Sequence, residues 1–246
     1  MEQLIYGIHP VRECLRSGTR PVSCLYIARG TGSPGLKAIV QLARRRGHTV
    51  RFESRNFLDQ RVGGANHQGV AAVCIAPSFL EVEDLLDGLG PAPLVVALDS
   101  VEDPRNLGAV LRCCAAAGVD GVIVTKDHSA GLTATVSKAA AGGLEYLSIA
   151  RVSNLGRAID QLKKKGIWVA GLESGQPLGC QDLDFTLGMA LVLGNEGAGL
   201  RRLVREKCDF LASIPTPGPI QSLNVSVAAG IVLYEAIRQR DLSRSN

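Results

Sequence analysis

The sequence predicts an α/β protein, in which a small basic module precedes a larger domain built on a mostly parallel sheet. From Leu94 onward, short apolar runs alternate with amphipathic helical segments, which is typical of parallel strands covered by helices. Residues 1–77 carry 11 basic and 4 acidic side chains, whereas the remainder is mildly acidic. The stretch 78–93 is acidic and bounded by Pro and Gly, so we expect a linker there between domains 1–77 and 94–246.

The first module mixes helical and extended patterns in a short length of chain. Apolar residues at helical spacing, stopped by Gly47, mark the central helix, and β-branched alternation marks the strands. We therefore expect helices at 11–15, 35–47 and 56–62, and strands at 22–28, 49–54 and 69–76. Together they form a compact module of three or four strands.

The second domain is predicted from apolar runs that read as strands buried on both faces. These runs are 94–99, 121–125, 146–150, 167–171, 189–194 and 210–214, and segments such as 154–166 between them are amphipathic helices. Sheets of this kind bind ligands at the carboxyl ends of their strands. The loops after Asp99, Gly194 and Ile214 are therefore the candidate binding loops.

Composition excludes several classes of protein. No apolar run approaches the ~18 residues that a membrane span needs, and the early Glu2 interrupts any signal-like core. We expect a soluble cytoplasmic protein. Seven cysteines without a C-x-x-C spacing argue against a disulfide framework and against zinc, so no metal is expected. The basic first module indicates either a polyanionic partner or a solvated surface.

The first candidate loop, 99–108, leads into a helix of almost wholly apolar or small residues. Asn106 is the expected N-cap, and we expect the helix to be buried. Arg112 is its charged residue, which either pairs with a structural carboxylate or faces a polar cleft. Arg105 lies seven residues earlier, so both would share a face if the helix begins early enough.

The other two loops are irregular for different reasons. In the loop 193–200, glycines let backbone amides approach a ligand closely, but Arg202 stands where a dinucleotide fingerprint needs glycine. In the loop 214–224, three prolines fix a rigid path. Asn224 and Ser226 near the following helix are either helix caps or site residues.

Taken together, DPRNLGAVLR, LVLGNEGAGL and IPTPGPIQSLNVSVAAGIVLYE resemble the three motifs of the SpoU-type (TrmH-like) branch of the SPOUT RNA methyltransferases. YGIHPVREC and NHQGV match the N-terminal substrate-binding module of members that methylate guanosine in large-subunit rRNA. KDHSAGLTATVSKAAAGG matches the segment between the first two motifs, where Ala141 replaces the small polar or thiol residue of many relatives. The resemblance covers essentially the whole chain.

The resemblance implies a SPOUT domain with a parallel sheet and a deep trefoil knot, joined to a small ribosomal-protein-like α/β domain. It also implies transfer of a methyl group from S-adenosyl-L-methionine to a ribose 2′-hydroxyl, in a guanosine of 23S rRNA. The matched cofactor-binding residues are Leu193, Gly194, Ile214, Pro215 and Leu223. The matched catalytic residues are Asn106, Arg112, Glu196 and Asn224. Members are homodimers, and the helix from Val225 to Arg238 is apolar enough to contribute to that interface.

Two roles for Arg112 follow from this resemblance. Because the pKa of arginine lies above ~12, we hypothesise that Arg112 holds the adjoining phosphate and lowers the pKa of the 2′-hydroxyl. Glu196 and Asn106 would orient it, and Asn224 would shape the pocket. The alternative is that Arg112 takes the proton itself.

RNA binding is assigned to basic residues, because phosphate contacts position RNA without reading its sequence. The candidates are Arg12, Arg16, Arg44, Arg45, Arg46, Arg55, Arg61, His67 and Arg105. Two alternatives stay open: a tRNA 2′-O-methyltransferase of the same family, and an RNA-binding protein without catalysis. A nucleotide-binding oxidoreductase is disfavoured by the missing fingerprint.

Overall fold

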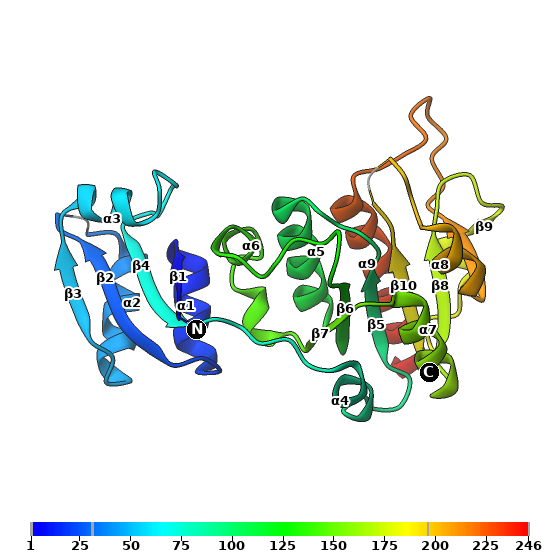
Figure 1. Cartoon of the computed structure of the whole chain (residues 1–246), viewed down its shortest axis with the longest axis horizontal. Helices are drawn as coiled ribbons and strands as arrows, with labels where there is room; N and C mark the ends of the chain where they lie inside the picture. Colours follow the sequence, from blue (N-terminus) through cyan, green and yellow to red (C-terminus); the bar gives the residue numbers. More distant parts are fainter. Residues whose placement is uncertain (1, 31, 196, 246) are drawn as a thin grey trace. The chain divides into compact units, whose positions relative to one another are not determined.

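The computed structural model describes residues 2–30, 32–195 and 197–245, without the side chain of residue 245 (Figure 1). Contacts divide the chain into two compact units. The first comprises Met1–Pro77 and Gly131–Tyr146, and the second comprises Ser78–Ala130 and Leu147–Asn246. This division differs from the expected one in two ways. Residues 131–146, which we expected in the second domain, pack with the first unit, and residues 78–93, which we expected to be a linker, belong to the second unit.

The first unit is built on one four-stranded sheet in the order β1-β4-β2-β3. Its strands are β1 (Glu2–Tyr6), β2 (Val22–Ala28), β3 (Val50–Glu53) and β4 (Val70–Ile75), and its helices are α1 (Ile8–Ser17), α2 (Pro34–Arg45), α3 (Arg55–Arg61) and α6 (Ala134–Ala139), followed by the 3₁₀ turn η1 (Gly143–Tyr146). Successive side chains of β2 point to opposite faces. Leu25 and Ile27 pack in the core with α1 and α2, whereas Tyr26 packs with α3.

Local signals explain most of these boundaries. Ser33 caps α2 by accepting a hydrogen bond from the Leu36 amide at 3.4 Å, and Pro34 supplies the first helical φ. Ser54 caps α3 in the same way. The strand β1 was absent from our expectations. It pairs antiparallel with β4, a partner about 70 residues away that no local pattern could indicate.

Residues 131–146 are fastened to the first module by buried polar contacts. The Glu145 carboxylate forms an ion pair with Arg20, and both side chains are almost fully buried. Thr19 Oγ1 donates to the same carboxylate at 3.0 Å, and Gln3 Nε2 donates to the Leu132 carbonyl at 2.7 Å. A broken ion pair of this kind is costly, so the segment is an integral part of the first unit.

The second unit contains a seven-stranded sheet, parallel throughout its described pairings, in the order β7-β6-β5-β10-β8-β11-β9. Its strands are β5 (Leu94–Leu98), β6 (Gly121–Thr125), β7 (Ile149–Val152), β8 (Trp168–Leu172), β9 (Leu178–Gly179), β10 (Met189–Leu193) and β11 (Phe210–Ser213). The strand expected at 146–150 starts later because residues 143–146 form η1. The parallel sheet is confirmed, and the trefoil knot stays a prediction.

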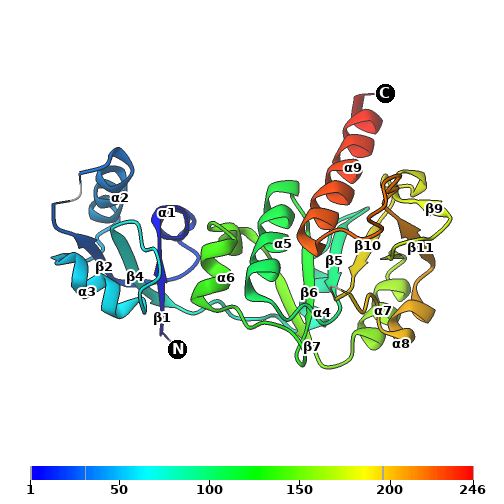
Figure 2. The same cartoon turned by 90° about the horizontal axis from the view of Figure 1, so that it is seen from above.

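Helices cover both faces of this sheet (Figure 2). The helices α5 (Pro104–Ala117) and α9 (Val225–Ser245) lie side by side on one face. The other face carries α4 (Val82–Asp87), α7 (Leu155–Lys164) and α8 (Arg202–Lys207), which share one core. The 3₁₀ turn η2 (Cys180–Asp182) follows β9. Within the described ranges, no helix combines the length and apolarity that a membrane crossing requires.

Candidate functional site

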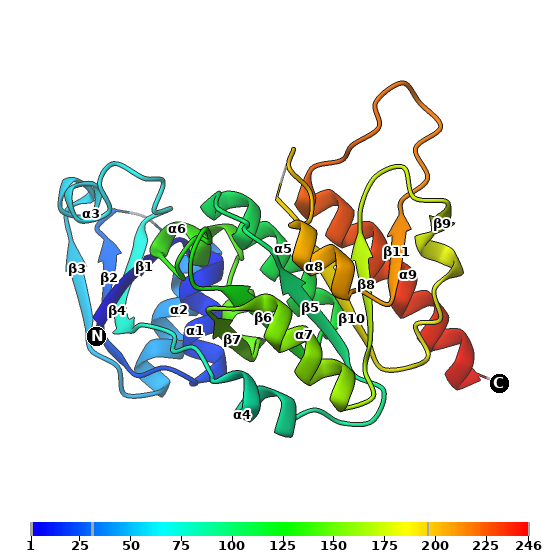
Figure 3. The same cartoon turned by 45° about the vertical axis from the view of Figure 1, so that its right-hand side comes forward.

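A cavity of about 480 Å³ lies at the carboxyl ends of β8, β10 and β11. Its wall comprises Leu172, Glu173, Ser174, Gln176, Leu193, Gly194, Asn195, Gly197, Ala198, Gly199, Arg205, Ile214, Thr216, Gln221, Ser222, Leu223, Val225 and Ala228. Four of the five residues expected to bind the cofactor are in this wall. The exception is Pro215, whose two neighbours line the cavity while Pro215 itself does not. Residues of the loop from β11 to α9 form one side of the cavity, and Figure 3 shows the course of this loop.

The loop after β10 closes on itself beside this cavity. The backbone amides of Asn195 and Gly199 each donate to the carbonyl of the other, at 3.1 and 3.0 Å. A Cβ at Gly194 would overlap the Gly199 carbonyl group and lie 2.7 Å from the Leu200 nitrogen. Gly194 is therefore needed for close approach of two backbones within the loop itself. The approach of backbone amides to a ligand, which the sequence indicated for this loop, stays a prediction.

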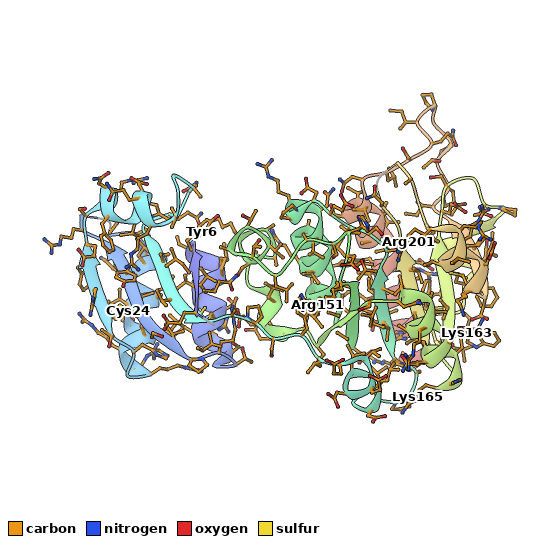
Figure 4. All side chains as sticks on the ribbon, in the orientation of Figure 1. Tyr6, Cys24, Arg151, Lys163, Lys165 and Arg201 are labelled. Carbon is orange, nitrogen blue, oxygen red and sulfur yellow. The ribbon has the colours of Figure 1, made fainter. Side chains whose placement is uncertain are left out.

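The same loop is anchored by a buried carboxylate. Asp99 follows β5 and is fully buried. Its carboxylate accepts hydrogen bonds from the Arg201 amide at 2.9 Å and from Arg201 Nε at 2.6 Å, and it forms an ion pair with Arg201 Nη2 at 2.6 Å. Arg201, at the start of α8, is labelled in Figure 4. Asn195 Nδ2 also donates to the Ser100 carbonyl at 2.7 Å. These bonds fix the loop after β10 to the loop after β5.

The wall contributed by the loop after β8 was missed by sequence analysis. Glu173 Oε2 forms an ion pair with Arg205 Nε and accepts a hydrogen bond from Gln176 Nε2, each at 3.0 Å. The strand 167–171 was predicted, but the loop after it was left out of the candidate set. Applying the carboxyl-end rule to every strand would have found these residues.

Asn106 is not the N-cap of α5, which is a correction to our expectation. Asp103 is the cap, because its carboxylate accepts from the amides of Arg105 and Asn106 at 2.6 and 3.2 Å, and Pro104 starts the helix. The Asn106 carboxamide is thereby free for another partner. Its Oδ1 accepts from Asn224 Nδ2 at 3.0 Å, which joins the first motif to the third.

Asn224 is a helix cap, one of the two roles that the sequence left open, and its role as a site residue stays a prediction. Its Oδ1 accepts from the amide and the hydroxyl of Ser226, at 2.9 and 2.6 Å, as a residue does when it caps a helix. Its Nδ2 meanwhile reaches Asn106. The starts of α5 and α9 are therefore linked through two amide side chains.

The expectation that α5 is wholly buried was wrong. One face, including Leu107, Leu111 and Cys114, is buried, while Arg105 and Arg112 are both exposed. Arg112 has neither a structural carboxylate nor another hydrogen-bonding partner among the described residues. Because the helix begins at Pro104, the two arginines lie two turns apart on it, as their spacing indicated.

Cysteine chemistry does not contribute to this site. Burial raises the pKa of the Cys113 and Cys114 thiols, next to Arg112, so both stay protonated at neutral pH. Five of the seven cysteines are buried and all seven are free, which confirms their reading as small core residues. Glu196 lies outside the described residues, and its catalytic role stays a prediction.

The RNA-binding candidates of the first unit fall into two groups. Arg44, Arg45 and Arg55 are exposed and their side chains have no hydrogen-bonding partner among the described residues. The others are engaged: Arg12 and Arg16 pair with Glu13, Arg46 donates to the Arg16 carbonyl, and Arg61 stacks on Tyr26 and Phe57.

His67 requires a correction, because it does not line a binding edge. Its side chain is 1% exposed. Nε2 lies 3.0 Å from Asp59 Oδ1, and Nδ1 accepts from the Gly69 amide at 3.0 Å. Both ring nitrogens are used within the fold, so His67 holds the turn before β4 instead of facing RNA.

Comparison with known proteins agrees with this geometry. Residues 93–234 match the SpoU rRNA Methylase family, and residues 4–80 match the family described as RNA 2′-O ribose methyltransferase substrate binding. The 23S rRNA (guanosine-2′-O-)-methyltransferase RlmB of Xylella fastidiosa (strain 9a5c) is 45% identical, over 98% of each chain. The putative TrmH family tRNA/rRNA methyltransferase YacO of Bacillus subtilis (strain 168) is 39% identical, over 96% of each chain.

Solved structures give the same result. The SpoU methyltransferase AviRb from Streptomyces viridochromogenes, in complex with the cofactor AdoMet, superimposes with a TM-score of 0.82 at 28% identity. The match covers 98% of this chain and 91% of that chain. The chain therefore belongs to the SpoU rRNA methylase family and is an S-adenosylmethionine-dependent RNA 2′-O-ribose methyltransferase.

Proposed function

We propose that this protein methylates the ribose 2′-hydroxyl of a guanosine in 23S rRNA. The substrate is proposed from the 45% identity to the 23S rRNA (guanosine-2′-O-)-methyltransferase of Xylella fastidiosa. The observation that supports the chemistry is the Asn106–Asn224 hydrogen bond, which joins the helix bearing Arg112 to the loop that walls the cavity. A methyl-donor site and an exposed arginine are thereby held on one rigid framework. Positioning of donor and acceptor is the main requirement for an in-line methyl transfer.

The cavity fits S-adenosylmethionine in size and chemistry. About 480 Å³ is within the range of small-molecule sites, and apolar side chains with backbone groups suit a neutral purine. Because Gly194 has no side chain, the Gly199 backbone can pack against it, and this close approach shapes the wall of the cavity. When bound, the cofactor supplies a sulfonium methyl group that is already activated for transfer. Pro215 would stiffen the adjoining wall.

The residues outside the cavity act on the acceptor. Arg112 is exposed and unpaired in the described chain, so its guanidinium is available to hold the phosphate beside the reacting ribose. That contact lowers the pKa of the 2′-hydroxyl, since a nearby cation favours the anionic form. The hydrogen bond between Asn106 and Asn224 holds the starts of α5 and α9 together, and Glu196 would orient Arg112.

RNA docking is assigned to the exposed arginines of both units. Arg44, Arg45 and Arg55 have no internal partner among the described residues, and Arg105 is exposed at the start of α5. Each is therefore able to contact a phosphate without breaking a contact of the fold. Arg61, which stacks on two aromatic rings, would contact RNA only with its outer edge.

We also propose that the protein works as a homodimer through α9. Val227, Ile231 and Tyr234 are 49%, 41% and 58% exposed and recur at helical spacing. Such an apolar stripe on a helix favours a protein partner. Replacing Ile231 with Asp should convert a dimer to a monomer in light scattering after size exclusion. A monomeric wild-type protein would contradict the proposal.

The deciding experiment is transfer of tritiated methyl groups from S-adenosylmethionine to deproteinised rRNA and to bulk tRNA, both taken from cells that lack the protein. We expect labelled 2′-O-methylguanosine in 23S rRNA. Arg112→Ala should abolish labelling while retaining cofactor affinity. Arg202→Ala, at an exposed arginine whose ion-pair partner among the described residues is Glu206, should not. Labelling of tRNA alone would overturn the substrate, and absence of cofactor binding would overturn the chemistry.

A further inference from the structure

Three segments that the methyl-transfer site does not use meet at one point of the first unit. Gln68 Oε1 accepts a hydrogen bond from the Ile8 amide at 3.1 Å and another from Lys138 Nζ at 2.9 Å. The three residues belong to YGIHPVREC, NHQGV and KDHSAGLTATVSKAAAGG. Partners 60 and 70 residues apart thus converge on one carboxamide oxygen, and all three lie within the same compact unit.

The ammonium of Lys138 lies against the backbone at Gly7, in space that is open because Gly7 has no side chain. Gly7 has a φ of 96°, and a Cβ at this position would collide with Lys138 Nζ. The Tyr6 ring, labelled in Figure 4, has its centroid 5.9 Å from Nζ. Gln68 adopts a φ of 53°, and its amide is bonded to Asn66 Oδ1 at 3.2 Å. The groups around the Lys138 ammonium, which are the Gln68 carboxamide, the Gly7 backbone and the Tyr6 ring, are therefore all neutral.

The Lys138 ammonium lacks a counter-ion among the described residues. Among the described residues, no carboxylate lies within ion-pair distance of Lys138, and Glu13 on the neighbouring α1 already pairs with Arg12 and Arg16. Desolvation lowers the pKa of Lys138, the direction expected for a cation that burial penalises without compensation. An ammonium has three N–H donors, and Gln68 accepts only one hydrogen bond from it.

We propose that Lys138, held in place by its contacts with Gln68, Gly7 and Tyr6, binds a phosphodiester group of the RNA substrate. The inference rests on the proposed function, because it takes RNA as the partner. An ammonium is a compact point charge that suits a phosphate oxygen. A bound phosphate would supply the missing counter-ion, and it would add to the attraction exerted by the many basic residues of this unit.

The test compares full-length wild type with Lys138→Met, which keeps most of the side-chain volume and removes the charge. Affinity for 23S rRNA is measured by filter binding at several salt concentrations. We expect roughly tenfold weaker binding, and a salt dependence whose slope is smaller by about 0.7–0.9. Lys37→Met is the matched control, because Lys37 is an exposed lysine of the same unit whose side chain has no described partner.

A second variant tests the site without truncating any side chain. Gln68→Glu keeps the acceptor for Ile8 and Lys138 but gives Lys138 an internal counter-ion, so we expect the same loss of affinity and slope. Unchanged affinity and slope in both variants, with wild-type methyl transfer intact, would overturn the phosphate site alone. Failure of the wild type to bind or methylate rRNA would overturn the proposed function and this inference together.

Discussion

Gly194→Ala is expected to weaken cofactor binding through a collision between two backbones. The added Cβ would overlap the Gly199 carbonyl group and lie 2.7 Å from the Leu200 nitrogen, so the loop has to open. Opening breaks the two backbone hydrogen bonds between Asn195 and Gly199. At about 0.5–1.5 kcal/mol each, their loss amounts to about 1–3 kcal/mol. That free energy corresponds to roughly 5- to 150-fold weaker binding of the cofactor.

Titration calorimetry with S-adenosylhomocysteine measures this loss directly. Gly218→Ala is the matched control, because it makes the same substitution in the loop between β11 and α9, where a Cβ would meet open space. We expect its dissociation constant to equal that of the wild type. If Gly194→Ala also binds like the wild type, then the closed loop after β10 does not shape the cofactor site, and the reasoning fails.

Three further predictions concern the framework around the site. Asn224→Asp keeps the cap acceptor for Ser226 but loses the donor to Asn106, so kcat should fall at least tenfold with little change in Tm. Asn224→Ala should lose about 1 kcal/mol of unfolding free energy as well; equal kcat in all three proteins would contradict the role of the amide pair. Glu145→Gln leaves Arg20 buried without its counter-ion and should lower the unfolding free energy by about 3–5 kcal/mol in urea denaturation. A change below 1 kcal/mol would show that residues 131–146 are not fastened by this pair. Hydrogen bonds from Arg238, assisted by one from Gln239, lower the pKa of Glu235 to about 2, below an unfolded value of about 4.3. This stabilisation is present above the unfolded pKa and is lost as pH falls toward 2, so Glu235→Gln should reduce the acid-induced loss of stability by about 1 kcal/mol. Parallel pH curves for wild type and variant between pH 6 and 2.5 would refute it.

The sequence by itself determined the parts of this protein that depend on local pattern. Continuous apolar runs predicted six of the seven strands of the parallel sheet, each within three residues, because burial on both faces leaves no room for polar alternation. The two-residue strand β9 was missed because it is too short to show a pattern. The motif loops located the cavity that we propose for the cofactor, since ligands of such sheets bind at strand carboxyl ends. Charge per segment identified the basic unit. All of these inferences can be made without knowing which distant residues are in contact.

Tertiary structure alone decided the contacts between distant segments. Asn106 meets Asn224 across 118 residues, and Arg20 meets Glu145 across 125. Burial could not be predicted for single side chains either: Arg112 is exposed on a helix expected to be buried, whereas His67 is buried by its bonds to Asp59 and Gly69. The physical reason is that a polar side chain is buried only where it finds a hydrogen-bonding partner. Which residue becomes that partner depends on how the whole chain packs.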